Sequence, residues 1–561
     1  WTLQFIPVSD CGVVALIAGH IAEGGEIPVF FYGQPYMGSL EPMLSALLCR
    51  LFGTSGFMVC LGTAFAGSLQ LPPVYLWARD AGGRYAGLFA LLFCVVGSEI
   101  YFELSAAPLG GYMTMMTFGL LTVWISGRIA AALAANEPAP RGLYIALGLS
   151  AGLGWWCQQL IVAFFAAAAV TLLPALRWSM VRRGLLLSLP CFIIGSMPWW
   201  AWNMINGWPS LEFGALLGGV TVARGVAGVV AQFRDLAGLD SSSAWWGLFR
   251  AVLFLAAAAG FLAMTAREAR KGGNRSFLFH RIAAVALIVA TAVFFARSYW
   301  ALFPGTSRYL LPAYPALALV VGVCAARLVQ ARLLPVAILA LVVLTPPYWL
   351  GLARMGKSLA AHAQSRDAAR MLARDLPPEC GGVCYGDYSW HWMNFATEEK
   401  LCVACLPKEK YAPYAVRAEL APGPAYLEDA SHISSFLRLT GGTGLRISLH
   451  GFRIEYGLVP PPSDWRYLED NPASVCDGIS TQHLPALSDE VADSSWTTSI
   501  ESDSLKHLAF SFAKPANLCG LRMVSPNGNY PPYWRIEGLP ADSEEWLTLV
   551  PQALVSDRLF W

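Results

Sequence analysis

Apolar residues in this chain occur in long runs that short polar connections separate. From Asp10 to about Gly351, runs of about 16–24 mostly apolar residues recur, and each is long enough to cross a hydrocarbon core of about 30 Å. No such run follows Leu352, where polar residues reach an ordinary frequency. The pattern predicts a polytopic α-helical membrane domain over residues 1–351, followed by a soluble portion.

The length and spacing of the runs predict about ten membrane spans. The predicted spans are 56–78, 84–102, 111–130, 143–158, 161–176, 184–203, 245–266, 281–298, 309–328 and 333–351.

The connections between these spans alternate in character. One set is short and basic, and it includes Arg79, Arg84, Arg128, Arg141, Arg177, Arg182, Arg183, Arg267, Arg270, Lys271, Arg275, Arg327 and Arg332. The other set is aromatic, rich in Gly and often acidic. The positive-inside rule places the basic set in the cytoplasm. Counting spans then places the opening loop, Glu103, Arg308 and the soluble portion on the outer face.

Composition agrees with a membrane protein. Of the 561 residues, 56% are hydrophobic and 13% are charged, against about 25% charged in soluble domains. The net charge of +1 and the lack of a basic patch with interleaved aromatic residues give no case for a nucleic-acid partner. No cleavable signal peptide is visible. The first residues, Trp1–Val8, are typical of the end of a membrane span, so we expect a further helix to precede them.

The first acidic residue, Asp10, precedes a segment with helical spacing of apolar positions. Val13, Ile17 and Ile21 recur along Cys11–Gly24, which predicts an amphipathic helix lying in the membrane interface. Asp10 is placed to cap this helix. It is also placed to act at the membrane surface as a general base, because a sugar hydroxyl or an amine is a weak nucleophile until a base takes its proton.

An aromatic loop, Phe-Phe-Tyr-Gly-Gln-Pro-Tyr-Met-Gly-Ser-Leu-Glu-Pro at residues 30–42, follows. Tyr32 and Tyr36 are candidates to stack on sugar faces or to cover a lipid. Gln34 either bonds to a sugar or orders the loop. Glu41 precedes Pro42 at the start of an apolar helix, where an acid favours the helix dipole, and a role in the site is the alternative.

Two further charged residues are predicted at the outer ends of spans. Ionisable residues at membrane depth are costly, and they are usually functional or paired. Glu103 is a candidate to bind a metal or a substrate hydroxyl, or else it reaches water. Arg308, beside Tyr309, can hold a phosphate through its bidentate fork or serve as an interfacial anchor. No P-loop, dinucleotide-binding or zinc-protease motif competes with these readings.

Together these segments resemble a known family. The order of Ser9-Asp10, the loop 30–42, Gly110-Gly111-Tyr112, Gly154-Trp155-Trp156, Pro198 with Asn203 and Gly207-Trp208, and Ser307–Pro315 is similar to that in bacterial integral-membrane glycosyltransferases of the GT-C superfamily. The nearest groups in style are the protein O-mannosyltransferases and aminoarabinose transferases, and the resemblance covers most of residues 1–351.

The resemblance implies a bacterial inner-membrane enzyme with a polyprenyl-phosphate-linked sugar donor, a periplasmic lipid, glycan or protein acceptor, and membrane lipids as its surroundings. The implied reaction is a single displacement, in which Asp10 accepts a proton from the acceptor and Arg308 offsets the charge of the leaving phosphate. We assign as catalytic candidates Asp10 and Glu103, and as substrate-binding candidates Tyr32, Gln34, Tyr36, Glu41, Arg308 and Tyr309. No metal ligand is assigned, and a divalent metal cofactor is left open.

A second reading is a catalytically silent relative that serves as an accessory or scaffold subunit of a membrane complex. Many relatives carry a second acid directly after the first, where this chain has Cys11, and an acid and a His after the position of Tyr112, which are missing here. A transporter is a weaker third reading, because no inverted repeat or pair of broken spans is visible.

The soluble portion divides at Pro460–Pro462. Residues 352–460 predict a small periplasmic α/β domain, with a helix at Ser365–Leu376 and strands at Gly382–Gly386, Leu401–Leu406 and around Leu445–Leu458. The run 386–391 resembles the periplasmic domain of such transferases, and we expect His391 either to pack in a core or to contact substrate.

Residues 461–561 predict short strands with turns between them. Their order resembles a discoidin (factor 5/8 C-type) jelly-roll β-sandwich, a module that often binds glycans or lipid head groups. A structural cap on the α/β domain is the alternative.

The soluble portion also contains six of the thirteen cysteines, namely Cys380, Cys384, Cys402, Cys405, Cys476 and Cys519. An even number on the outer side favours disulfides, with Cys476–Cys519 as a candidate pair in the β-sandwich. The spacing of the first four also resembles a zinc site, and free thiols are the third alternative. We expect the seven cysteines from Cys11 to Cys324 to be apolar packing residues.

Overall fold

The computed structural model describes residues 9–175, 178–212, 220–239, 244–271, 274–345, 363–386, 391–405, 411–421, 425–427, 445–456, 473–476, 508–511, 533–538 and 547–554. The chain forms two compact units. The first contains residues 1–367 together with 391–396, and the second contains 368–390 and 397–561.

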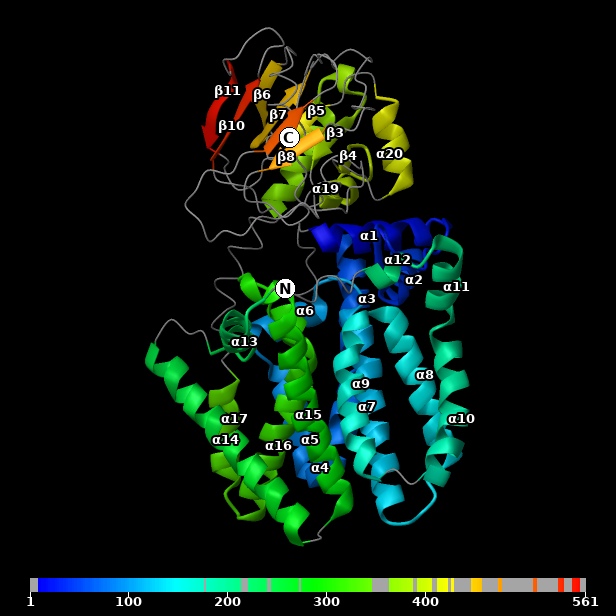
Figure 1. Cartoon of the computed structure of the whole chain (residues 1–561), viewed down its shortest axis with the longest axis vertical. Helices are drawn as coiled ribbons and strands as arrows, with labels where there is room; N and C mark the ends of the chain where they lie inside the picture. The colour runs from blue at the N-terminus through cyan, green and yellow to red at the C-terminus, as the bar shows by residue number, and fades with distance from the viewer. Residues whose placement is uncertain are drawn as a thin grey trace. The chain divides into compact units, whose positions relative to one another are not determined.

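The first unit is a helical bundle (Figure 1). Its long axis is built by α3 (Gly56–Ser68), α4 (Leu71–Gly82), α5 (Arg84–Val96), α7 (Tyr112–Ala134), α8 (Arg141–Cys157), α9 (Val162–Leu172), α10 (Trp178–Gly195), α14 (Ala244–Lys271), α15 (Arg275–Arg297), α16 (Tyr314–Gln330) and α17 (Leu334–Leu344). These helices fall on the ten apolar runs of the sequence. The prediction of a helical, multi-pass domain is therefore confirmed at this level.

The number of spans differs from the prediction. Among the described residues, five helices are long and apolar enough to cross a membrane, or six if a bent pair of helices counts as one span. They are Gly56–Gly82, Tyr112–Ala134, Trp245–Arg270, Arg275–Arg297 and Ser307–Gln330. A span needs about 20 residues, and helices such as α9, with 11 residues, and α17, with 11, are shorter. The count of ten spans is not confirmed.

Small residues allow the central helices of the bundle to approach one another closely. A Cβ atom at Gly322 on α16 would overlap the carbonyl oxygen of Ala86 on α5. At the start of α16, the ring of Tyr314 stacks on Tyr101 with 3.9 Å between centroids and lies 5.4 Å from Phe93. Close backbone approach at small residues is the usual way in which membrane helices gain van der Waals contact.

The predicted span 84–102 is interrupted. The chain bends by 80° between α5 and α6 (Glu99–Ala106). Gly97 adopts a positive φ of 41°, which glycine tolerates, and the Ser98 hydroxyl then caps α6 by accepting a hydrogen bond from the Tyr101 amide at 3.1 Å. Glu103 therefore lies on the short helix that follows the bend, at one end of the bundle, and the sequence pattern did not predict this bend.

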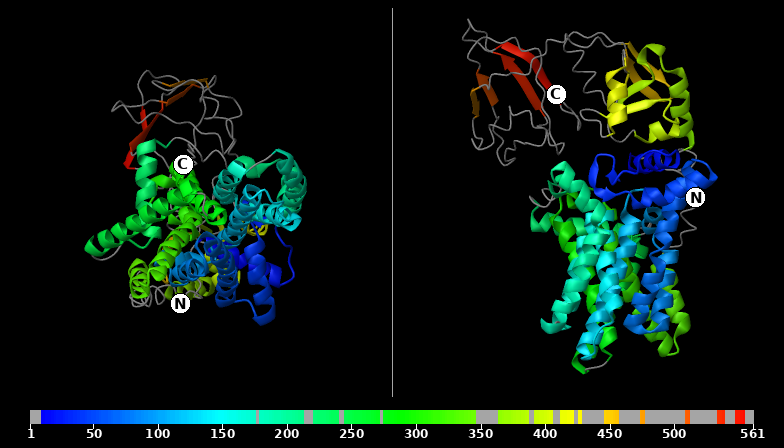
Figure 2. Two further views of the ribbon diagram at one scale, coloured as in Figure 1. Left: turned by 90° about the horizontal axis from the view of Figure 1, so that it is seen from below. Right: turned by 90° about the vertical axis from the view of Figure 1, so that its right-hand side faces the viewer.

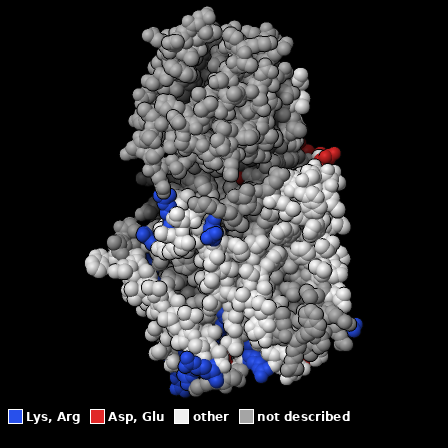
Figure 3. All heavy atoms as spheres, in the orientation of Figure 1, with Lys and Arg blue, Asp and Glu red and all other residues white. Residues whose placement is uncertain are grey.

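Short elements gather at the same end of the bundle as α6 (Figures 1 and 2). They include α1 (Ser9–Ala22), β1 (Phe30–Phe31), β2 (Gln34–Gly38), α2 (Leu40–Phe52), α11 (Met197–Asn206), α12 (Pro209–Glu212) and α13 (Val222–Leu236). The connections α4–α5, α7–α8, α14–α15 and α16–α17 lie at the opposite end (Figure 1), where basic residues gather (Figure 3). The bundle thus separates the two predicted sets of connections.

The second unit contains a five-stranded sheet with the order β4-β3-β5-β7-β6. Its strands are β3 (Val383–Gly386), β4 (Cys402–Cys405), β5 (Ala425–Leu427), β6 (Leu445–Leu449) and β7 (Phe452–Tyr456). β3 pairs in parallel with β4 and β5, whereas β7 pairs antiparallel with β5 and β6. The predicted helix is present at residues 363–375, and the predicted strands coincide with β3, β4, β6 and β7.

Four more strands form two antiparallel pairs. β8 (Ala473–Cys476) pairs with β9 (Leu508–Ser511), and β10 (Tyr533–Gly538) pairs with β11 (Leu547–Leu554). The rest of 461–561, including Cys519, lies outside the described residues. The discoidin-like β-sandwich, its disulfide and the three-domain boundaries stay predictions.

The cysteines of the first unit follow the packing prediction, since five of the seven from Cys11 to Cys324 are buried thiols. In the second unit, Cys384 is a buried free thiol. Burial raises the pKa of Cys384 well above its usual range, and the neighbouring Cys380 and Cys402 thiols raise it further. Cys384 therefore follows the free-thiol alternative.

Candidate functional site

An ion pair joins the two ends of the membrane sequence. Asp10 lies in the first turn of α1, and Arg308 lies 298 positions later in η5 (Ser307–Ala313). Arg308 Nη1 donates to Asp10 Oδ2 at 2.8 Å, and the side chains are 30% and 16% exposed, respectively. Hydrogen bonds between two ions are among the stronger ones in proteins, and this pair is partly shielded from solvent. The structure thus brings the predicted base and the predicted phosphate ligand into direct contact.

The ring of Tyr309 lies next to the guanidinium group of Arg308, and two further aromatic rings contact Tyr309. Arg308 Nη2 lies 3.4 Å from the Tyr309 hydroxyl, and the guanidinium carbon lies 5.2 Å from the centre of the Tyr309 ring. Tyr309 in turn stacks on Trp300, with 5.5 Å between centroids, and meets the edge of Tyr112 at 6.4 Å. A cation held over such rings is stabilised and its orientation is restricted.

Tyr36 on β2 belongs to the same cluster. Burial raises the pKa of its hydroxyl far above the usual range, the nearby Tyr309 and Asp10 raise it further, and Arg308 opposes the shift. The Tyr36 hydroxyl therefore stays protonated and can donate a hydrogen bond to an anion.

Three carboxylates act on one buried thiol. Burial raises the pKa of Cys11 well above its usual range, the neighbouring Cys60 adds to this, and the carboxylates of Asp10, Glu103 and Glu41 add further. These acids come from α1, α6 and α2, respectively. The position directly after Asp10 is thus filled by a neutral thiol near three acidic residues.

Glu41 is 1% exposed, and it faces the start of α7. Its Oε2 accepts the backbone N–H of Met113 at 3.3 Å. Gly110 and Gly111, which precede α7, have positive φ angles of 92° and 31°, and Gly111 offers no side chain to cap the helix. Glu41 supplies that acceptor from another helix. Burial raises its pKa to about 7, although bonds from α7 and Thr63 oppose the shift.

The aromatic loop is held by segments that lie far away in the sequence. Trp156 Nε1 donates to the Val29 carbonyl at 3.0 Å, and Met37 forms a β-bridge with Gln158. Ser210 donates its hydroxyl proton to the Pro35 carbonyl. Two of the motifs that carried the family resemblance, the loop 30–42 and the segment 154–156, therefore lie side by side.

Gly38 allows β2 to approach the end of α8. A Cβ atom at position 38 would overlap the carbonyl oxygen of Trp156 and reach its indole ring. We expect Gly38→Ala to lower stability by about 1–3 kcal/mol, measured as a lower thermal unfolding midpoint in detergent. Gly142→Ala is the matched control, because no atom lies within 4 Å of the added methyl group. Equal midpoints for both variants would show that this contact is unimportant.

The remaining loop candidates are placed as follows. Tyr32 Oη lies 2.8 Å from His20 Nδ1 on α1, so this tyrosine is tied to the end of the helix that carries Asp10. Gln34 is buried, with 7% of its surface exposed, which fits an ordering role for the loop better than an open contact surface.

Helix α1 differs from the prediction of an interfacial amphipathic helix. Residues 11–19 are all buried, so the helix has no solvent-facing stripe over this length. It packs on α2, and its other side is covered by α19 (His391–Ala396). Gly12 permits that contact, since a Cβ atom there would overlap the backbone of Trp392. His391 is buried at 3% exposure, which fits a core residue.

Several residues of this site were not predicted as such. Tyr112 was noted only within a motif, and Trp300 and His20 were not assigned. The sequence carried a signal for Tyr112, because a residue after two glycines at a helix start is fixed in direction by the turn. Trp300 and His20 show no local pattern that separates them from other interfacial residues. Among the described residues, no group of three or more His, Cys, Asp or Glu side chains could hold a metal ion.

No protein family matches the chain by sequence, and no curated protein does so either. Its fold is similar to that of ArnT from Cupriavidus metallidurans. With the crystal structure of ArnT bound to undecaprenyl phosphate, the TM-score is 0.53 at 15% identity, over 80% of this chain and 93% of ArnT. With the apo form the TM-score is 0.55 at 14% identity, over 81% and 95%.

A weaker likeness is to the oligosaccharyltransferase AglB from Archaeoglobus fulgidus, with a TM-score of 0.42 at 14% identity over 83% of this chain and 72% of AglB. At such identities the likeness to ArnT concerns the fold. It agrees with the helical membrane architecture expected from the sequence, and the superfamily and subfamily stay predictions.

Proposed function

We propose that this protein is a membrane glycosyltransferase that moves a sugar from a polyprenyl-phosphate donor to an acceptor on the outer face of the bacterial inner membrane. The observation that carries the proposal is the contact between Asp10 and Arg308 at one end of a bundle with an ArnT-like fold. A base and a phosphate ligand side by side are what a displacement at a sugar–phosphate bond requires.

In this mechanism Asp10 takes the proton of the acceptor hydroxyl or amine. The acceptor atom forms a bond to the anomeric carbon while the bond from that carbon to the phosphate oxygen breaks. The ion pair uses Oδ2 of Asp10, so the second carboxylate oxygen is available to the proton. The electron pair of the broken bond stays with the polyprenyl phosphate.

Arg308 stabilises the negative charge that develops on the leaving phosphate. Tyr309 and Trp300 restrict the orientation of its guanidinium group, and the protonated Tyr36 hydroxyl supplies a further donor. Glu103 completes the proposal as a second acid near Asp10, where it orients the acceptor or the sugar. Electrostatic groups that are fixed before the reaction are often the largest contribution to catalysis.

The domain assignment and location extend this proposal. Residues 352–460 would form a periplasmic α/β domain, and 461–561 a discoidin-like module. Their outer location follows from the alternation of charge along the chain.

A catalytically silent accessory subunit is the second candidate. The buried Cys11 in place of a second acid favours it, because one fewer carboxylate lies at this end of the bundle. In that case the pair of Asp10 and Arg308 would hold α1 to η5 without turnover.

Binding of undecaprenyl phosphate to the purified protein tests the assignment of Arg308. We expect Arg308→Gln to weaken binding by about tenfold or more, because a charge-assisted contact to phosphate is worth about 1.5–3 kcal/mol. Arg297→Gln removes an exposed arginine and should leave affinity unchanged. Equal affinity for the wild type and Arg308→Gln would contradict the assignment.

Lipid and glycan mass spectrometry of cells that lack the protein tests the whole function. If the protein is a glycosyltransferase, we expect the donor lipid to accumulate in these cells and the glycosylated product to disappear. Unchanged lipids and glycans would favour the accessory subunit.

A further inference from the structure

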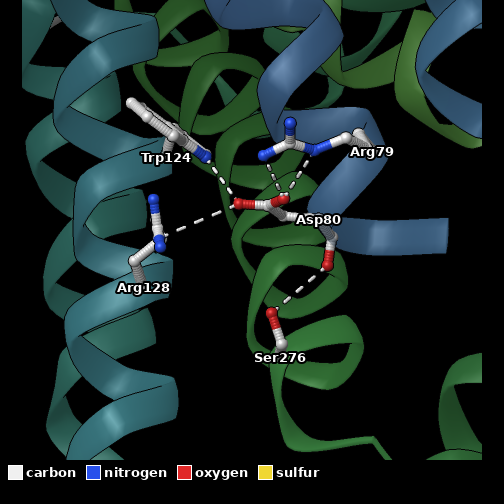
Figure 4. A network of polar contacts seen from close by, with 5 residues as sticks. All are labelled: Arg79, Asp80, Trp124, Arg128 and Ser276. Carbon is white, nitrogen blue, oxygen red and sulfur yellow. Dashed lines mark hydrogen bonds and ion pairs between the residues drawn. The ribbon is translucent and has the colours of Figure 1, made fainter. Parts of the chain in front are cut away.

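A second polar cluster (Figure 4) lies toward the end of the bundle opposite to α1 (Figure 1). Its centre is Asp80 in α4. The Oδ1 atom of Asp80 accepts hydrogen bonds from Nε and Nη2 of Arg79 at 3.1 and 3.0 Å. Its Oδ2 accepts Trp124 Nε1 at 2.9 Å and lies 4.0 Å from Arg128 Nε. The backbone carbonyl of Asp80 accepts the hydroxyl of Ser276 on α15.

The carboxylate of Asp80 does not use all the donors of the two guanidinium groups. Arg79 bonds through two of its nitrogens, and Arg128 approaches through one, at a long distance. In Figure 4 one nitrogen of Arg79 and one terminal nitrogen of Arg128 point away from Asp80. The two arginine side chains are 40% and 48% exposed, whereas that of Asp80 is 16% exposed. The two arginine side chains are therefore more exposed than the carboxylate that they contact.

A further cation, Arg281, contacts the residue that follows Asp80. Arg281 on α15 is 2% exposed, and its Nε donates to the Ala81 carbonyl at 2.9 Å. Its Nη1 is buried without a hydrogen-bond partner among the described residues. Glu268, on α14, attracts this guanidinium group, and Arg327 repels it. The local balance of charge around Asp80 stays positive.

The cluster lies close to one end of α4 and of α15. Ser276 and Arg281 lie in the first two turns of α15, and Arg79 lies in the last turn of α4. Trp124 holds Arg128 against its ring, with the guanidinium carbon 5.6 Å from the centroid. A guanidinium group near the end of a membrane helix is costly unless an anion reaches it. Lipid phosphate is the anion present there.

We propose that Arg79 and Arg128, oriented by Asp80 and Trp124, form a binding site for the phosphate of an anionic phospholipid. Asp80 holds the two guanidinium groups at a fixed separation, which lowers the entropy cost of binding. The phosphate accepts hydrogen bonds from the guanidinium nitrogens that do not contact Asp80, and the acyl chains lie along the apolar surface of the bundle. This site is independent of the proposed glycosyl transfer.

Native mass spectrometry of the purified full chain with phosphatidylglycerol tests the site, with phosphatidylcholine as the neutral comparison. The test variant is Arg79→Gln/Arg128→Gln, and Arg128→Gln alone perturbs the fold least. The matched control is Arg267→Gln/Arg270→Gln, which removes two exposed arginines of α14 at the same end of the bundle. We expect affinity for phosphatidylglycerol to fall by about 5-fold for the single variant and about 30-fold for the double variant. The control should lose little.

Equal losses in the test and control double variants would overturn the proposal, because they would reflect the overall charge of this end. Equal affinity for phosphatidylcholine would overturn it as well. Competition with glycerol phosphate distinguishes a lipid ligand from a soluble phosphate ligand. If glycerol phosphate competes at the concentration of the lipid, the ligand is a soluble phosphate and the lipid assignment is wrong. Thermal unfolding midpoints in phosphatidylcholine identify any variant that fails to fold. If the double variant fails, the affinity of Arg128→Gln for phosphatidylglycerol decides whether the proposal holds.

Discussion

Replacing Asp10 by Asn is expected to lower the rate of sugar transfer by about 10²–10⁴-fold, the usual contribution of a general base. The variant keeps the size of the side chain and an oxygen that can accept from Arg308, so the fold at this end of the bundle should persist. It loses the ability to take a proton. Transfer from purified polyprenyl-phosphate sugars, measured for both proteins under saturating donor, checks this result.

Two controls make the result specific to Asp10. Glu23→Gln and Glu26→Gln remove exposed acids close to the same helix, and they should transfer sugar at the wild-type rate. Binding of undecaprenyl phosphate should be retained in Asp10→Asn, because Arg308 then has no anionic partner to compete with the phosphate. Equal turnover by wild type and Asp10→Asn would remove this residue from the mechanism. Loss of both turnover and lipid binding would indicate a structural role for the ion pair.

The helical part of the fold could be predicted because hydrophobic runs reflect a local physical requirement. A segment that lies in hydrocarbon must be apolar over its length and satisfy its backbone internally. Breaks in such a run are harder to predict. The bend between α5 and α6 depends on the positive φ of Gly97 and on the hydrogen bond between Ser98 and Tyr314. That hydrogen bond joins residues that lie far apart in the sequence.

The site could be predicted only in part, for a related reason. Charges at predicted loop ends pointed to Asp10 and Arg308, but nothing in either segment shows that the two side chains touch. The sequence predicts an amphipathic helix at α1 because Val13, Ile17 and Ile21 recur at helical spacing. Its burial arises from α19, a segment about 380 positions away, which no local pattern connects with α1.

Glu41 illustrates how an environment formed by distant segments sets the chemistry of a side chain. The sequence placed it at the start of α2, where it would favour the dipole of that helix. In the structure its carboxylate instead caps α7, and thereby fixes the first turn that carries Tyr112 toward Tyr309. The titratable groups near Glu41 are the thiols of Cys11 and Cys157. Burial keeps Cys11 protonated at neutral pH, so it adds no charge.

Glu41→Gln is expected to remove a pH dependence of stability. The pKa of Glu41 is raised from the ordinary 4.5 to about 7, mainly by burial, so between these values the folded state binds one proton more than the unfolded state. The free energy of unfolding of the wild type should therefore fall as pH rises through this window, by about 3 kcal/mol in all, and change little above it. Glutamine keeps an acceptor for the Met113 amide but cannot ionise. Thermal unfolding midpoints of both proteins are measured in detergent from about pH 5 to about pH 8. The midpoint of the wild type, relative to that of Glu41→Gln, should fall as the pH rises. Parallel curves would show that Glu41 does not titrate in this range, and that its carboxylate is stabilised by α7 more strongly than burial disfavours it.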